Sequence, residues 1–89
     1  MNNRAVNKFW KYFERLPQAI QNQAEKNFEL WKKNPRHPGL KFEQVHPVKP
    51  FYSIRVSQKY RALARKEGDT FFWFWVGTHN DYEKIIAQL

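Results

Sequence analysis

Cysteine is absent from this sequence. Disulfide bonds and thiolate metal ligands are therefore excluded, which fits a reducing compartment such as the cytosol. The three histidines, His37, His46 and His79, lie far apart and show none of the spacings that metal ligands usually have. We therefore expect no bound metal and no cofactor.

Long apolar stretches are also missing, because the sequence has no run of about 18 apolar residues. Its N-terminal segment is amphipathic, with neither the continuous apolar centre nor the small-residue cleavage site of a signal peptide. We therefore expect no membrane segment and a cytoplasmic location.

Positive charge and aromatic side chains are abundant. The 89 residues carry a formal net charge of +8, and 18% of them are aromatic, including four tryptophans. A chain of this length holds one small core, so we expect a single domain over residues 1–89 in which a few large rings supply much of the buried surface. The charge favours a polyanionic partner: nucleic acid first, an acidic protein second, and an anionic membrane surface third.

Two amphipathic helices are predicted in the first third of the chain. Over residues 4–16, apolar side chains recur at the spacing of one helix face: Val6, Phe9, Trp10, Phe13 and Leu16. Pro17 ends this helix and suits the first turn of the next one, predicted over residues 18–33. So short a connection indicates a helical hairpin. The cluster of breaking residues at 34–39 predicts a loop.

Strands are predicted further along, where the apolar period changes to two. The expected strands cover residues 40–45, 51–57, 60–66 and 71–76. The last one is apolar on both sides, so we expect it in the centre of the sheet, as core and not as a platform for stacking bases. Its alternation places Phe71, Trp73 and Trp75 on one side and Phe72, Phe74 and Val76 on the other.

The order of these elements predicts the fold class. A short helix beginning at Asn80 or Asp81 completes the chain. Helices followed by a run of strands indicate an α+β fold. We expect an N-terminal helical hairpin packed on a small twisted antiparallel sheet of about four strands, with a short C-terminal helix.

Two arginines lie on neighbouring predicted strands. Arg55 and Arg61 are separated by a tight turn that contains Lys59, so they can be close in space. Like charges opposite each other destabilise a sheet, so their presence indicates an anion, such as a phosphate, between them. Arg65 lies further along the second strand. The pattern fits equally well a solvated basic face with no ligand.

Two further candidates follow the aromatic strand. His79 comes directly after its end, and a histidine can act as acid or base near neutral pH; the alternative, a surface-loop histidine without a function, is the more frequent outcome of such patterns. Tyr82 opens the apolar stripe of the last helix, so core packing is its default role. Its hydroxyl could still reach the rim of a cleft, and its ring could stack on a base.

The segment FYSIRVSQKYRALARKEGD and the ending FFWFWVGTHNDYEKII resemble the RelE/ParE superfamily of toxins from bacterial toxin–antitoxin systems. The resemblance covers most of the chain from Leu40 to Ile86, and the helical hairpin agrees with it. It implies the hairpin-on-sheet fold with a basic cleft on the other sheet face. RelE-like members are metal-independent, ribosome-dependent endoribonucleases that cut messenger RNA, leave a 2′,3′-cyclic phosphate and inhibit translation.

The resemblance also implies roles for individual residues. Arg55 and Arg61 match the basic strand residues of the RelE-like enzymes, and His79 and Tyr82 match the C-terminal histidine and tyrosine of the histidine-using members. These four are the predicted catalytic residues. The predicted RNA-binding residues are Arg55, Lys59, Arg61 and Arg65.

Two positions depart from the family pattern. Ser53 and Arg55 replace a lysine-rich version of the strand, which argues against a lysine as general base. Glu43 is a possible counterpart of the carboxylate base in some relatives, but its spacing is too loose for that role to be assigned.

Messenger RNA on the ribosome and a cognate antitoxin protein are the partners that the resemblance implies. Two alternatives remain open. A ParE-type toxin shares the fold but inhibits DNA gyrase by binding and needs no catalytic histidine, and a non-catalytic RNA-binding paralogue keeps the fold alone. His79 at the end of the last strand favours the nuclease.

Overall fold

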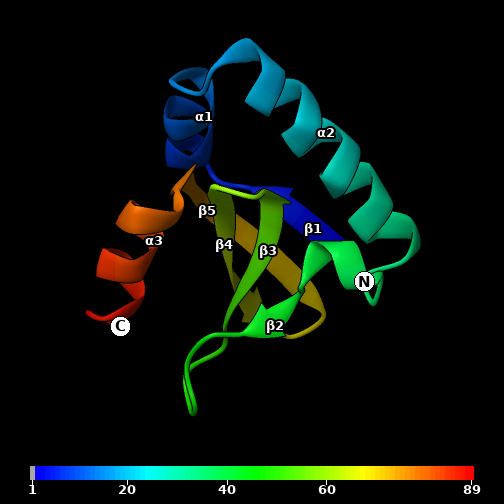
Figure 1. The fold of residues 1–89 in the computed structure, drawn as a ribbon. Coiled ribbons are helices and arrows are strands. Elements are labelled where there is room, and N and C mark those ends of the chain that lie inside the picture. Colours follow the sequence, from blue (N-terminus) through cyan, green and yellow to red (C-terminus); the bar gives the residue numbers. More distant parts are fainter. Residues whose placement is uncertain (1) are drawn as a thin grey trace.

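A computed structural model describes residues 2–89, so residue 1 of the predicted domain lies outside the described residues. Figure 1 shows a helical hairpin on one side of a sheet and a third helix on the other. The elements in chain order are β1 (Asn2–Ala5), α1 (Asn7–Glu14), α2 (Gln18–Lys33), the 3-10 helix η1 (Pro38–Leu40), β2 (Glu43–Gln44), β3 (Phe51–Ser57), β4 (Tyr60–Glu67), β5 (Thr70–Thr78) and α3 (His79–Ile86).

The strands form one mixed sheet in the order β1-β5-β4-β3-β2. β1 runs parallel to β5, and the other neighbouring pairs are antiparallel. The predicted α+β class, with a helical hairpin on the sheet and a short C-terminal helix, is confirmed. So is the interior position of the aromatic strand, β5. We predicted about four antiparallel strands. The sheet has one strand more, β1, and this strand runs parallel to its neighbour.

β1 lies where the first helix was predicted to begin. The Asn2 amide donates to the Asp69 carbonyl and the Val6 amide to the Trp73 carbonyl, both at 3.0 Å, so β5 and the turn before it hold the segment. The sequence NNRA has no alternating pattern, and its pairing with a distant strand overrides local propensity. The strand predicted over residues 40–45 is also shorter, since only Glu43–Gln44 pair with β3.

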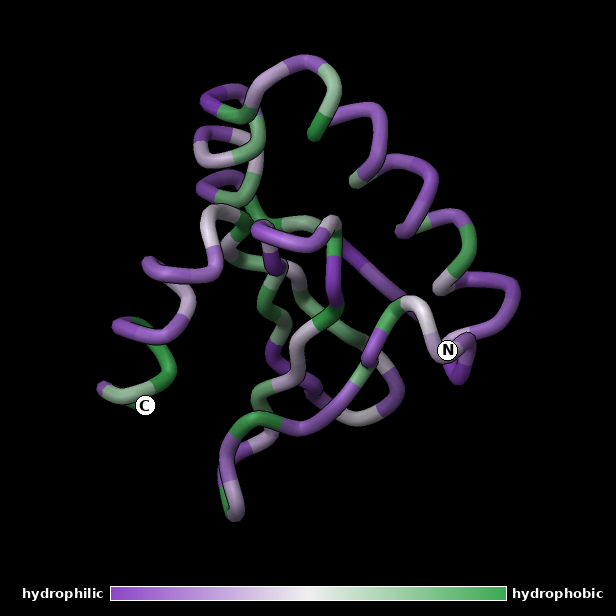
Figure 2. The backbone as a smooth tube through the Cα atoms, viewed as in Figure 1, coloured by the Kyte–Doolittle hydropathy of each residue, from purple (hydrophilic) through white to green (hydrophobic). Residues whose placement is uncertain are grey.

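The helical hairpin covers one face of the sheet. α2 has the predicted bounds, and Figure 2 shows it hydrophilic along much of its length, with apolar residues at intervals. Trp31 of α2 is almost fully buried, and its ring meets those of Phe71 and Trp73 edge to face at centroid distances of 5.3 and 5.4 Å. Such packing of large rings supplies the core. Among the helices of residues 2–89, none is long and apolar enough to cross a membrane.

The alternation of side chains between the two faces of β5 is interrupted at Phe74. The ladder places Trp73 opposite Ala64 and Trp75 opposite Leu63, so Phe74 is an extra, unpaired residue of a β-bulge. Trp73 therefore faces the hairpin, and Trp75 faces α3. The predicted alternation, with both tryptophans on one side, is wrong because one inserted residue exchanges the faces of all that follow it.

α3 begins at His79, one residue before the predicted start. The Thr78 hydroxyl oxygen accepts the Asp81 amide proton at 3.2 Å and so caps the helix. Tyr82 is the buried residue of α3, and it packs with Leu63 and Trp75. α3 lies mainly against β4 and β5, and the Tyr82 hydroxyl extends from it to Ser53 on β3.

Gly77 is needed because the ring of Trp75 lies over it. A Cβ atom on Gly77 would stand 2.6 Å from Trp75 Cζ2. We predict that Gly77→Ala lowers the free energy of unfolding by about 1–3 kcal/mol, measured by urea denaturation. In a Trp75→Leu background the same substitution should cost less than half as much, because the ring is gone. An equal cost in both backgrounds would contradict this explanation.

Candidate functional site

The sheet face that α3 partly covers carries the two arginines of the predicted site. Arg55 on β3 and Arg61 on β4 are direct partners in the ladder, so both side chains leave the sheet on the same side. The prediction that they lie close together is confirmed. Two opposed cations repel each other and attract an anion placed between them. We call this surface, made of Glu43, Ser53, Arg55 and Arg61, the basic face.

One nitrogen of Arg61 is engaged by the turn between β3 and β4. Its Nη1 donates to the carbonyl oxygens of Ser57, Gln58 and Tyr60 at 2.8, 3.3 and 2.9 Å. Every hydrogen bond of the Arg61 side chain within residues 2–89 uses this nitrogen. The guanidinium is thereby fixed in direction, and its other nitrogens are the ones to offer to a ligand.

The surroundings of Arg61 disfavour its charge. Burial first, and then the positive charge of Arg55, lower the pKa of Arg61, while Tyr82 and Glu43 act in the opposite direction. Free arginine has so high a pKa that the side chain remains a cation near neutral pH. A bound anion would relieve the repulsion that Arg55 causes.

His79 lies next to the same turn. Its backbone amide donates to the Lys59 carbonyl at 2.7 Å, which ties the start of α3 to the turn between β3 and β4. Its imidazole Nε2 stands 3.5 Å from a carboxylate oxygen of Glu83, and the side chain is 40% exposed, so solvent and ligands can reach it. Within residues 2–89, no three histidine or acidic side chains come together as a metal-binding group.

Tyr82 packs in the core and directs its hydroxyl toward the basic face. It is 7% exposed and packs in the core under α3. Its hydroxyl lies 3.5 Å from the Ser53 hydroxyl on the basic face, and its ring centroid is 5.5 Å from that of His79. The phenol therefore reaches the floor of the basic face, while its ring is too buried to serve as a stacking platform.

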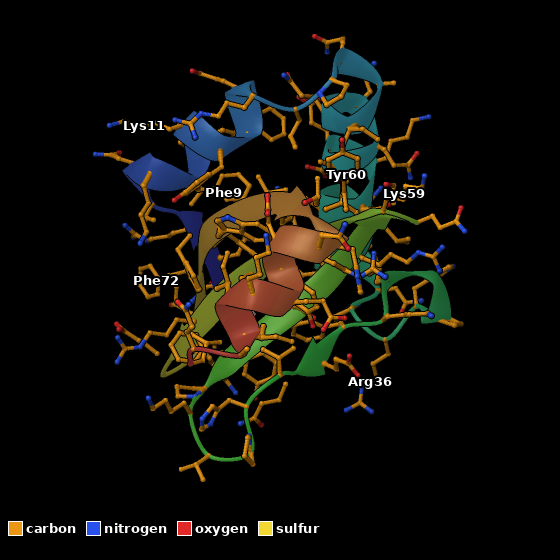
Figure 3. All side chains as sticks on the ribbon, turned by 60° about the vertical axis from the view of Figure 1, so that its left-hand side comes forward. Phe9, Lys11, Arg36, Lys59, Tyr60 and Phe72 are labelled. Carbon is orange, nitrogen blue, oxygen red and sulfur yellow. The ribbon has the colours of Figure 1, made fainter. Side chains whose placement is uncertain are left out.

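The remaining two predicted residues lie apart from the arginine pair. Figure 3 shows Lys59 projecting outward from the turn between β3 and β4. Arg65 is on the same face of β4 as Arg61 but four residues further, about 13 Å along the strand. Its Nε lies 3.6 Å from a carboxylate oxygen of Glu67. Lys59 belongs to the turn that also binds Arg61, whereas Arg65 lies away from that turn.

Glu43 is a residue that the sequence interpretation did not assign. It pairs with Ser53, so the strand register places it on the basic face, and its charge acts on Arg61. Its position depends on the pairing of a strand of two residues, for which the sequence carries no spacing signal. The face therefore combines cations with a carboxylate and, beside them, a histidine.

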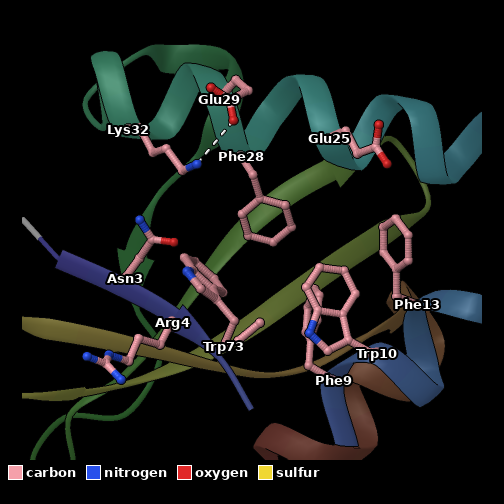
Figure 4. A pocket seen from close by; sticks show the side chains of 11 residues that line it. Asn3, Arg4, Phe9, Trp10, Phe13, Glu25, Phe28, Glu29, Lys32 and Trp73 are labelled. Atoms are coloured by element: carbon pink, nitrogen blue, oxygen red, sulfur yellow. Dashed lines mark hydrogen bonds and ion pairs between the residues drawn. The ribbon is translucent and has the colours of Figure 1, made fainter. Parts of the chain in front are cut away.

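A separate hollow of about 440 Å³ opens on the opposite side of the sheet, between the helical hairpin and β1. Figure 4 shows the rings of Phe28, Trp73 and Trp10 beside it, and Trp10 is 49% exposed. Lys32 at its rim is paired with Glu29 at 3.1 Å. This hollow suits apolar contacts, whereas the groups suited to phosphate chemistry are on the basic face.

We predict opposite effects on stability for the two arginines. Arg55→Gln removes the repulsion and should raise the free energy of unfolding by about 0.2–0.5 kcal/mol at low salt. Arg61→Gln also loses the hydrogen bonds to the turn and should lower it by about 1–2 kcal/mol. Urea denaturation at two salt concentrations measures both, and the gain from Arg55→Gln should shrink at high salt as the repulsion is screened. A clear loss of stability in Arg55→Gln would contradict the repulsion.

Solved structures show the same fold at low sequence identity. A chain of the RelB–RelE antitoxin–toxin complex from Methanococcus jannaschii is 17% identical, with a TM-score of 0.72 over 91% of this chain and 95% of that chain. The YoeB/ParE toxin from Agrobacterium tumefaciens is 16% identical, with a TM-score of 0.69 over 89% and 99%. YafQ from Escherichia coli strain BL21(DE3) is 13% identical, with a TM-score of 0.72 over 91% and 96%.

Sequence comparison assigns the family. A search of curated protein sequences gave no match. The family model of the ParE-like toxin domain matches residues 18–84, which is more than half of the chain. The matched residues begin at the start of α2 and include most of α3. This protein therefore belongs to the family of ParE-like toxin domains.

Proposed function

We propose that this protein is the toxin of a toxin–antitoxin pair and that it cleaves messenger RNA on the ribosome in the cytoplasm. The observation that carries the proposal is the arrangement around one turn: Arg55 and Arg61 face each other across it, and His79 is hydrogen-bonded to it. Membership of a toxin-domain family and the shared fold of RelE, YoeB and YafQ structures support it.

The cleavage is an attack by the RNA on itself. The 2′-hydroxyl loses its proton, the 2′-oxygen forms a bond to the neighbouring phosphorus, and the bond from phosphorus to the 5′-oxygen breaks. The 5′-oxygen takes a proton, which leaves a 2′,3′-cyclic phosphate and a 5′-hydroxyl. Negative charge builds on the phosphate oxygens in the transition state. Arg55 and Arg61 are neighbouring cations on one face of the sheet, Arg61 held by the turn, and would stabilise that charge.

Two groups beside the arginines can move the protons. Glu43 carries a carboxylate on the basic face and is a candidate base for the 2′-hydroxyl, while His79 in its protonated form is a candidate acid for the 5′-oxygen. The Glu83 carboxylate near Nε2 is placed to pair with a protonated His79. In this assignment Tyr82 holds the bound phosphate or sugar through its hydroxyl and supports His79 through its ring.

The ribosome would supply the sequence preference of the cleavage. The net charge of +8 provides attraction to RNA without sequence preference. Lys59 in the turn adds a further contact to the backbone phosphates, and Arg65 adds one at a distance. Sequence or codon preference would then come from how the ribosome presents the message to the basic face.

A second candidate function is inhibition of DNA gyrase by binding. The specific observation that favours it is the match to the ParE-like family model. Such a toxin would use its surface for protein contact and would not depend on proton transfer by His79. A non-catalytic RNA-binding protein of the same fold would also not depend on proton transfer by His79, but it would retain affinity for RNA.

Activity measurements on site variants separate these functions. Purified protein, added to ribosomes programmed with a defined message, should cleave it, and His79→Gln or Glu43→Gln should lower the rate at least about a hundredfold. Arg61→Ala should lower it by a similar factor. A supercoiling assay with DNA gyrase, run in parallel with the same proteins, should show no inhibition.

Matched variants away from the basic face serve as controls. His37→Gln removes a loop histidine, and Arg4→Ala removes an arginine beside the hollow on the opposite side of the sheet. Both should cleave at the wild-type rate. Circular dichroism must show each site variant folded. An intact message together with blocked supercoiling would establish the gyrase inhibitor in place of the nuclease.

The antitoxin is the second proposed partner. Chains from RelB–RelE, RelBE2 and archaeal RelE–RelB complexes share the fold of this protein. We predict that the product of a short adjacent reading frame with an acidic or amphipathic tail co-purifies with the protein and abolishes its activity, by covering the basic face or displacing α3. Co-expression followed by affinity purification measures this, and failure of any adjacent product to bind would contradict it.

A further inference from the structure

Asn27 on α2 makes an unusual pair of hydrogen bonds across the interface between the hairpin and the sheet. Its side-chain nitrogen Nδ2 donates to the carbonyl oxygens of Arg55 and Val56, at 2.9 and 2.8 Å. Its Oδ1 accepts from Gln23 at 3.1 Å. Both partners on β3 are carbonyl oxygens, which only accept, so the amide nitrogen must be the atom that faces them.

The two carbonyls belong to an irregularity in β3. In a regular strand successive carbonyls point in opposite directions, so one side chain rarely reaches two in a row. The ladder shifts between Arg55 and Ser57, which leaves Val56 as a bulged residue without a partner on β4. Asn27 donates to the carbonyls of both residues at this irregularity, and a carbonyl without a donor in this half-buried place would be costly.

The bulge leads directly into the turn that holds the candidate site. Arg55 is the last regular residue before it. The carbonyls of the turn bind Arg61 Nη1, and the Lys59 carbonyl accepts the His79 amide proton. Three of the four predicted catalytic residues are therefore attached to one short segment, and Asn27 holds the beginning of that segment from the opposite sheet face.

We propose that Asn27 is a positioning residue of the RNA-cleaving site: by holding the β3 bulge it sets the directions of Arg55, Arg61 and His79. It does not touch the basic face itself, because α2 lies on the other side of the sheet. The inference rests on the proposed function for its catalytic consequence. Its structural content, that Asn27 orders the turn, is independent of that function.

Local structure gives no other reason for asparagine at this place. Asparagine is a poor residue for the interior of a helix, and alanine would favour α2 more. Its neighbour Phe28 fills the expected packing role, with ring centroids 5.8 Å from Phe9 and 5.0 Å from Trp73. Asn27 contributes hydrogen bonds at a position where packing alone would favour an apolar side chain.

Kinetics on programmed ribosomes test the catalytic consequence. In Asn27→Ala and in the similarly shaped Asn27→Asp, which lacks the donors, kcat should fall about ten- to a hundredfold because the reacting groups are misplaced. KM should stay within about threefold of wild type, since the cations remain. Phe28→Leu loosens the same helix without touching the bulge and should leave kcat unchanged, and so should Gln23→Ala, which leaves both carbonyl contacts in place.

Hydrogen exchange tests the structural part without any activity. The His79 amide, bonded to the Lys59 carbonyl, should exchange at least about tenfold faster in Asn27→Ala, measured relative to amides of the β1–β5 ladder, and not in Phe28→Leu. Unchanged exchange, or an equal change in both variants, would overturn the proposal. If wild-type protein cleaves no RNA, the nuclease assignment fails while the exchange result still decides whether Asn27 orders the turn. If the wild-type protein cleaves RNA and Asn27→Ala has the same kcat, Asn27 has no role in catalysis.

Discussion

Both faces of β5 must be covered, and this requirement sets the places of the other elements. Trp73 on one face needs the helical hairpin, and Trp75 on the other needs α3. The bulge at Phe74 decides which ring goes to which side. With β4 along one edge and β1 along the other, β5 exposes little apolar surface, and the remaining strands add to the sheet beyond β4. Burial of rings on this scale dominates the stability of so small a chain.

The candidate site lies where this covering ends. α3 packs on β4 and β5, and on the β3 side of the same face Ser53 and Arg55 follow Phe51. Because α3 starts directly after the last residue of β5, its first residue, His79, lies beside the turn that binds Arg61. The same turn binds the guanidinium of Arg61 and so fixes its direction. Rigid placement of charged groups before a substrate arrives is what electrostatic catalysis requires.

Local pattern was sufficient for the elements with a strong period. The bounds of α2 and the meeting of Arg55 with Arg61 follow from helical spacing and from a short turn between two strands. Features that depend on pairing across the chain were not predictable in this way. β1 has no strand pattern of its own, the bulge at Phe74 has no composition signal, and Glu43 reaches the basic face only through the register of β2 with β3. The partners of Asn27 are likewise visible only in three dimensions.

The chemistry of the cleaved ends is the most direct test of the central claim, that the basic face promotes attack by a 2′-hydroxyl on its own phosphate. A defined message on purified ribosomes would be incubated with the protein and the termini of its fragments analysed. We expect fragments that end in a 2′,3′-cyclic phosphate and begin with a 5′-hydroxyl, formed only when ribosomes are present. Fragments that begin with a 5′-phosphate, or a message left intact by folded protein, would contradict it.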